Sequence, residues 1–86
     1  MTRESMPLEE IRAGFLAELT GIAPELAPGE IAETAHLQED LGLDSMDFLN
    51  LVAALHRRFG VAVPEADYPR LATPAAAVDY LAAALG

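Results

Sequence analysis

Ser45 is the side chain of this 86-residue sequence whose type and position are best suited to chemistry. Asp44 precedes it and Asp47 follows it by two residues. In this pattern Asp44 caps a helix and Asp47 completes an acidic capping box. A hydroxyl in the first helical turn is exposed and outside the helical hydrogen-bond ladder, so a bulky group can be attached there. The helix start favours an anionic group such as a phosphate by about 0.3–1 kcal/mol, partly opposed by the two aspartates.

Hydrolytic chemistry at Ser45 is disfavoured by its surroundings. The sequence lacks the Gly-x-Ser-x-Gly elbow of hydrolases, and its only histidines are His36 and His56. His56 is eleven residues further along the same predicted helix, which places it about 16 Å away. We expect His36 to be a solvated loop side chain.

A metal site is also disfavoured. Asp40, Asp44 and Asp47 do not have the alternating spacing of a calcium-binding loop, so we expect solvated carboxylates. The chain has no cysteine, which excludes disulfides and thiol chemistry of its own.

The first element expected to support this site is a helix that begins after a Ser5 cap, has Pro7 in its opening turn and ends near Gly21. Residues 22–44 show no sustained period and contain several prolines and glycines, which indicates a long loop. Apolar side chains should pin that loop to the core: Ile31, Leu37, Leu41 and Leu43. The first helix should bury one stripe: Leu8, Ile11, Phe15 and Leu19.

Two further helices follow the loop. The helix that contains Ser45 should end at Gly60 and lead into an extended segment over residues 61–64. Pro69 should limit residues 65–70 to one helical turn, and Thr73 with Pro74 should begin the last helix. The pattern predicts an all-α fold, an antiparallel four-helix bundle with three main helices and one short one, as a single domain over residues 1–86. Its core should include Ile11, Phe15, Phe48, Val52, Leu55, Phe59, Val78 and Leu81.

Charge and composition exclude several classes of partner. The net charge of −9 disfavours nucleic-acid binding. Residues 1–47 hold eleven acidic and two basic side chains, so partners should present basic patches to that part. No apolar run approaches the length of about 20 residues that spans a bilayer, and no signal peptide is evident. We therefore expect a cytoplasmic monomer that does not bind membranes.

The run from Asp40 to Leu49 resembles the signature of the acyl carrier protein family, an acidic-Leu-Gly-x-Asp-Ser-hydrophobic motif opening the second helix of a four-helix bundle. The matching residues are Asp40, Leu41, Gly42, Asp44, Ser45 and Met46. The resemblance extends over nearly the whole chain, through the exit at residues 59–64 to the last helix at residues 78–81.

The resemblance implies that Ser45 receives 4'-phosphopantetheine from coenzyme A through a phosphopantetheinyl transferase. The arm would carry acyl groups as thioesters, so the chain itself would catalyse no reaction. Asp44 would assist the modification, and Asp40, Met46 and Asp47 would dock partner enzymes. Those partners would include an acyl- or aminoacyl-loading ligase and downstream synthase enzymes.

The sequence departs from the familiar fatty-acid carriers in the second half of the motif helix. That half is basic, with His56, Arg57 and Arg58, where the family has further acids. This favours a free-standing acyl carrier for a dedicated lipid, polyketide or related pathway. An aminoacyl or peptidyl carrier would use the same serine, and an unmodified acidic helical adaptor is the alternative from another class.

Overall fold

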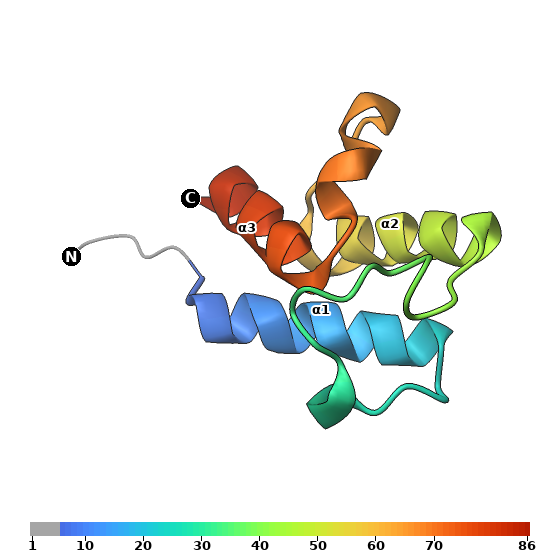
Figure 1. The fold of residues 1–86 in the computed structure, drawn as a ribbon. Helices are drawn as coiled ribbons and strands as arrows, with labels where there is room; N and C mark the ends of the chain where they lie inside the picture. Colours follow the sequence, from blue (N-terminus) through green and yellow to red (C-terminus); the bar gives the residue numbers. More distant parts are fainter. Residues whose placement is uncertain (1–5) are drawn as a thin grey trace.

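The computed structural model describes residues 6–86, and helices are the only regular secondary structure in that range. Within these residues there are three α-helices and two short 3-10 helices, arranged as in Figure 1. This confirms the predicted all-α bundle of three main helices and a shorter one, and adds the small η1. The elements in chain order are α1 (Leu8–Ile22), η1 (Pro28–Glu30), α2 (Ser45–Phe59), η2 (Glu65–Leu71) and α3 (Pro74–Leu85).

Helix α1 is the element on which the other two α-helices pack. Both α2 and α3 run in the direction opposite to α1, and η2 projects from the bundle while packing against α3 (Figure 1). The start of α2, and with it Ser45, therefore lies at the end of the bundle where α1 terminates.

The core is built from one stripe on each α-helix, together with single residues of η2 and of the loops. Its buried side chains are Ile11, Phe15 and Leu19 of α1, Phe48, Leu51, Ala54 and Leu55 of α2, Leu71 of η2, Ala77, Val78 and Leu81 of α3, and Ala23, Leu37, Leu43, Val61 and Val63 between the helices. Six of the eight predicted core residues are among them, whereas Val52 and Phe59 are only partly buried against this core. The buried stripe of α2 instead includes Leu51, which the sequence interpretation omitted. Leu8 was also misplaced, since it is 58% exposed and the stripe of α1 is buried only from Ile11 onward.

Local signals placed most helix ends correctly. Asp44 and Asp47 form the capping box of α2, and Gly60 ends that helix with φ +72°, in the left-handed region that favours glycine. The Ala76 N–H donates to Thr73 Oγ1 at 3.1 Å, which caps α3 as predicted.

The ends of α1 and the length of η2 differ from the prediction. Ser5, expected to cap α1, lies outside the described residues, and Pro7 is the N-cap residue rather than part of the first turn. Helix α1 continues through Gly21 to Ile22. The seven-residue η2 is longer than the single turn predicted, because Pro69 removes only one donor from a 3-10 helix and does not end it.

The long loop before α2 is tied to the bundle by backbone hydrogen bonds. The Leu37 N–H donates to the Ala72 carbonyl at 2.8 Å, and the Ala75 N–H donates to the Glu33 carbonyl at 3.0 Å. Glu33 also pairs with Arg12 of α1. As predicted, apolar residues anchor the loop: Leu37 and Leu43 are buried, and Ile31 and Leu41 partly so.

Candidate functional site

Ser45 is the first residue of α2, and its side chain is exposed. Its hydroxyl makes no hydrogen bond to any group within residues 6–86, and the same holds for the backbone N–H groups of Ser45 and Met46. The first N–H groups of a helix lack intrahelical acceptors and attract anions. The position therefore offers an accessible hydroxyl beside two donors suited to a phosphate.

The capping box fixes the residues on either side of Ser45. The Asp47 N–H donates to Asp44 Oδ1 at 2.8 Å, and the Asp44 N–H donates to Asp47 Oδ2 at 3.4 Å. The first bond is well formed and the second is long. Asp44 is exposed and Asp47 half-buried, so Asp47 serves the helix as well as the surface charge.

The loop immediately before α2 reverses at Gly42, which has φ +83°. A side chain at this φ is strained because its Cβ approaches the following carbonyl. Glycine therefore lets Leu43 turn into the core while Asp44 begins the helix. This gives a physical reason for Gly42 in the motif.

A cavity of about 490 Å³ opens next to Ser45, a volume within the range of ligand pockets. We call it the α2–η2 groove, since α2 and η2 supply most of its walls. Its lining residues are His36, Leu37 and Gln38 from the loop, Ser45, Phe48 and Leu49 from α2, Glu65, Tyr68 and Pro69 from η2, and Ala72. The groove joins an apolar floor to several polar side chains at its edges.

The η2 wall is held in place by aromatic side chains. Phe48 and Tyr68 meet edge to face, with centroids 5.3 Å apart. Tyr80 of α3 donates to Asp67 Oδ2 at 2.6 Å, and the Arg70 guanidinium lies 4.8 Å from the Tyr80 ring centroid. The hydrogen bond to Asp67 raises the pKa of Tyr80 above its ordinary value, which keeps the hydroxyl protonated as a donor.

His36 differs from the solvated loop histidine that was expected. It is half-buried, and its Nδ1 accepts hydrogen bonds from the N–H groups of Gln38 at 3.3 Å and Glu39 at 3.1 Å. Its own N–H donates to Asp40 Oδ2 at 2.8 Å. His36 thus organises the turn before α2 and lines the groove beside Ser45. An aspartate in a non-helical segment, whose side chain can accept from a backbone N–H four residues earlier, is the local sign of such a turn.

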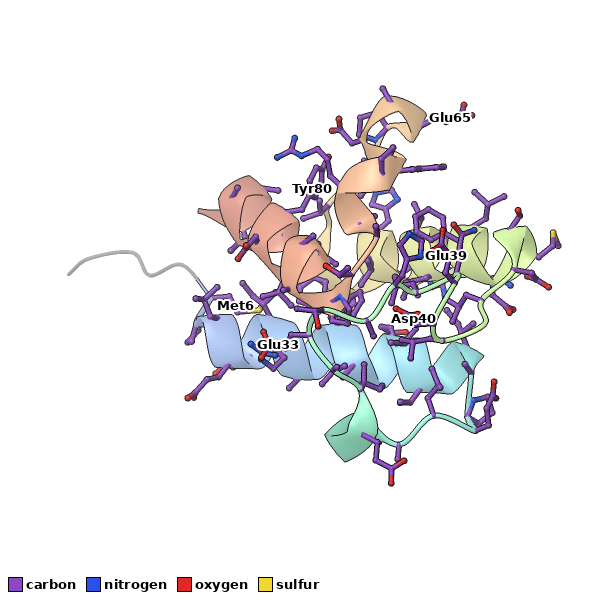
Figure 2. All side chains as sticks on the ribbon, viewed as in Figure 1. Met6, Glu33, Glu39, Asp40, Glu65 and Tyr80 are labelled. Atoms are coloured by element: carbon purple, nitrogen blue, oxygen red, sulfur yellow. The ribbon has the colours of Figure 1, made fainter. Side chains whose placement is uncertain are left out.

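The predicted docking residues have different surroundings. Met46 is 68% exposed, and Leu49, which was not predicted, is 47% exposed one turn further along α2. Asp40 is exposed but accepts the His36 hydrogen bond described above. Figure 2 shows Asp40 on the loop and Glu65 at the projecting end of η2.

The basic second half of α2 lies away from Ser45. Arg58 Nε donates to Glu18 Oε2 of α1 at 2.6 Å, whereas His56 and Arg57 are exposed. Across the part of the chain that the structure describes, no three His, Asp or Glu side chains gather into a candidate metal site. Within residues 6–86, no helix is both long and apolar enough to cross a membrane.

Comparison with known proteins identifies the family to which this sequence is similar. The sequence model of a family described as "Phosphopantetheine attachment site" matches residues 13–81. The chain is also 33% identical over 73 residues to a protein of Neurospora crassa named "Acyl carrier protein, mitochondrial". The aligned part is 85% of this chain and 54% of that protein, so the chain spans about half the length of this relative.

Proposed function

Because this chain belongs to the acyl carrier protein family, which bears 4'-phosphopantetheine, we propose that it carries acyl intermediates on an arm attached to Ser45. Residues 1–86 act as a single carrier domain and catalyse no reaction themselves. The carrier serves a dedicated lipid, polyketide or related pathway in the cytoplasm. The observation that supports this proposal most directly is the exposed Ser45 hydroxyl at the start of α2, beside the α2–η2 groove.

The residues around Ser45 fit such an arm. The hydroxyl has no competing partner among residues 6–86, and the adjoining groove offers both apolar and polar side chains to a flexible amide-containing chain. When bound, the arm supplies a terminal thiol that holds acyl groups as thioesters.

Attachment of the arm is a phosphoryl transfer to Ser45. The Ser45 Oγ–phosphorus bond forms, the pyrophosphate bond of coenzyme A breaks, the nucleotide half leaves and the hydroxyl proton is released. A separate phosphopantetheinyl transferase performs this step. Asp44 assists this step. One of its oxygens accepts from the Asp47 N–H, but the carboxylate is exposed and places negative charge beside Ser45, where the transferase and its magnesium ion bind.

The docking face for partner enzymes comprises Asp40, Met46 and Asp47. Met46 supplies an exposed apolar contact and the carboxylates attract basic patches on partners. These partners are the transferase, a loading ligase and downstream synthase enzymes. The basic second half of α2 suits enzymes that do not rely on a long acidic helix face.

Mass spectrometry of the protein incubated with coenzyme A and a broad-range transferase tests the proposal. We expect the mass to rise by one phosphopantetheine, located on the peptide that contains Ser45. A protein that remains unmodified would favour an acidic helical adaptor. Loading assays with acyl and aminoacyl substrates on the modified protein would then separate an acyl carrier from an aminoacyl or peptidyl carrier.

Neutralising Asp47 should weaken docking without unfolding α2. In Asp47→Asn the side-chain oxygen can still accept from the Asp44 N–H, but the charge is lost. We expect transfer from the arm to slow by a few-fold at low salt. The defect should shrink as the Debye length falls from about 10 Å to about 3 Å, because exposed charges act mainly on encounter.

Asp47→Lys and Arg57→Gln provide the comparison for Asp47→Asn. Asp47→Lys removes both the negative charge and the side-chain oxygen that accepts from the Asp44 N–H. Arg57→Gln removes a charge from the same helix far from Ser45, so it should have little effect on transfer. Transfer rates should be measured across salt concentrations, and melting temperatures on the same samples. A salt-independent Asp47→Asn defect accompanied by lower stability would show that Asp47 acts only as a cap.

A further inference from the structure

We propose that His36 binds the phosphopantetheine arm by donating a hydrogen bond from its imidazole Nε2–H to an oxygen of the arm within the α2–η2 groove. This inference rests on the proposed function, since it requires an arm on Ser45. It assigns a ligand contact to a residue outside the serine motif.

The hydrogen bonds of His36 determine which ring nitrogen carries the proton. Nδ1 accepts from the N–H groups of Gln38 and Glu39, so it presents a lone pair and no hydrogen. In a neutral imidazole the other nitrogen is then protonated. Nε2 is therefore a donor. Nε2 donates to no group within residues 6–86. Every buried side-chain nitrogen or oxygen atom in that range has a hydrogen-bond partner, so Nε2, which has none, must be accessible.

The orientation of this donor is set before any ligand binds. The His36 N–H donates to Asp40 Oδ2 at 2.8 Å, and the His36 carbonyl accepts from the Asp40 N–H at 2.8 Å. The next residue, Leu37, is fully buried and bonded to the Ala72 carbonyl. A donor held in this way loses little freedom on binding, which favours its use in recognition.

The groove contains few other side-chain donors for the arm. Glu65 can only accept when ionised, and the Ser45 hydroxyl is consumed by the phosphodiester. The arm itself offers phosphate oxygens and two amide carbonyls as acceptors. Three other lining side chains can donate a hydrogen bond: His36, Gln38 and Tyr68. Of these three, only His36 has its polar group oriented by hydrogen bonds within the described residues.

The wild-type test compares the protein before and after attachment of the arm by imidazole nitrogen NMR, under one mildly alkaline buffer condition. We expect the Nε2 resonance of His36 to shift on attachment and its ring protons to show proximity to the arm. His56, exposed on the far half of α2, should show neither change.

The variant test uses His36→Asn with His56→Asn as the matched control. The asparagine oxygen can replace Nδ1 as acceptor for the turn, but no donor remains at the position of Nε2. If the arm spends time in the groove, its terminal thiol should be alkylated roughly two- to tenfold faster in His36→Asn, the range expected for one lost hydrogen bond. His56→Asn should match the wild type.

An Nε2 resonance of His36 that does not move on attachment, in protein shown by mass to be fully modified, would overturn this inference while leaving the carrier function intact. Equal alkylation rates in the two variants would do the same. Backbone NMR signals of Gln38 and Glu39 report whether the turn is preserved in His36→Asn. If the turn is lost in that variant, the wild-type comparison alone tests the inference. Failure to attach any arm would instead reject the proposed function.

Discussion

Replacing Ser45 with alanine should abolish attachment of the phosphopantetheine arm completely. The substitution removes the only atom that can form the phosphodiester at this helix start, and no neighbouring hydroxyl takes its place. Thr20 Oγ1 donates to the Leu16 carbonyl at 2.9 Å within α1, and Thr73 Oγ1 caps α3. Thr34 lies in a turn of the long loop rather than at a helix start. The measurement is intact mass after incubation with coenzyme A and the transferase.

The fold of the Ser45→Ala protein should be unchanged, which makes the loss chemically specific. The serine side chain is exposed and unbonded within residues 6–86, and such surface substitutions usually alter stability by less than about 0.5 kcal/mol. Circular dichroism melting provides this control. Attachment of an arm to any other hydroxyl of the variant would contradict the assignment of Ser45.

Replacing Phe48 with alanine should destabilise the protein by roughly 3–5 kcal/mol, the cost of deleting a buried aromatic ring. Phe48 is 9% exposed and packs edge to face against Tyr68. The ring therefore joins α2 to η2 at the floor of the groove. Since domains of this kind have about 5–15 kcal/mol of total stability, the variant should be close to unfolding.

Leu49→Ala is the matched control for Phe48→Ala. Leu49 is the next residue of α2 and also lines the groove, but it is 47% exposed, so its loss should cost much less. Urea unfolding of both variants without the arm gives the comparison. If the two midpoints agree, Phe48 does not hold η2 against α2, and the groove wall has another support.

The helix ends around the site could be predicted from the sequence alone, because they depend on interactions between residues at most four positions apart. The start of α2 follows from Asp44 and Asp47, the start of α3 from Thr73, and the end of α2 from Gly60. Each signal acts on backbone groups one turn away or less, so it has the same effect in any fold. The exposed serine at a helix start, and hence the chemistry of the site, follows from these local rules.

The burial of α2 and the shape of the site were decided by tertiary structure. Both Leu51 and Val52 fit a helical stripe, and only the packing of α2 into the bundle selects Leu51 for full burial and leaves Val52 at the edge. Periodicity identifies an apolar face but not its centre, because neighbouring elements choose which part of that face they cover.

The α2–η2 groove could not be predicted from the sequence because its walls come from three separate segments. The Leu37 N–H bond to Ala72 ties the loop to the end of η2, and the contact between Phe48 and Tyr68 joins η2 to α2. His36 consequently lines the groove as a half-buried side chain. Local patterns specify where the reactive hydroxyl stands on its helix, whereas its surroundings depend on contacts that form only when the whole chain packs.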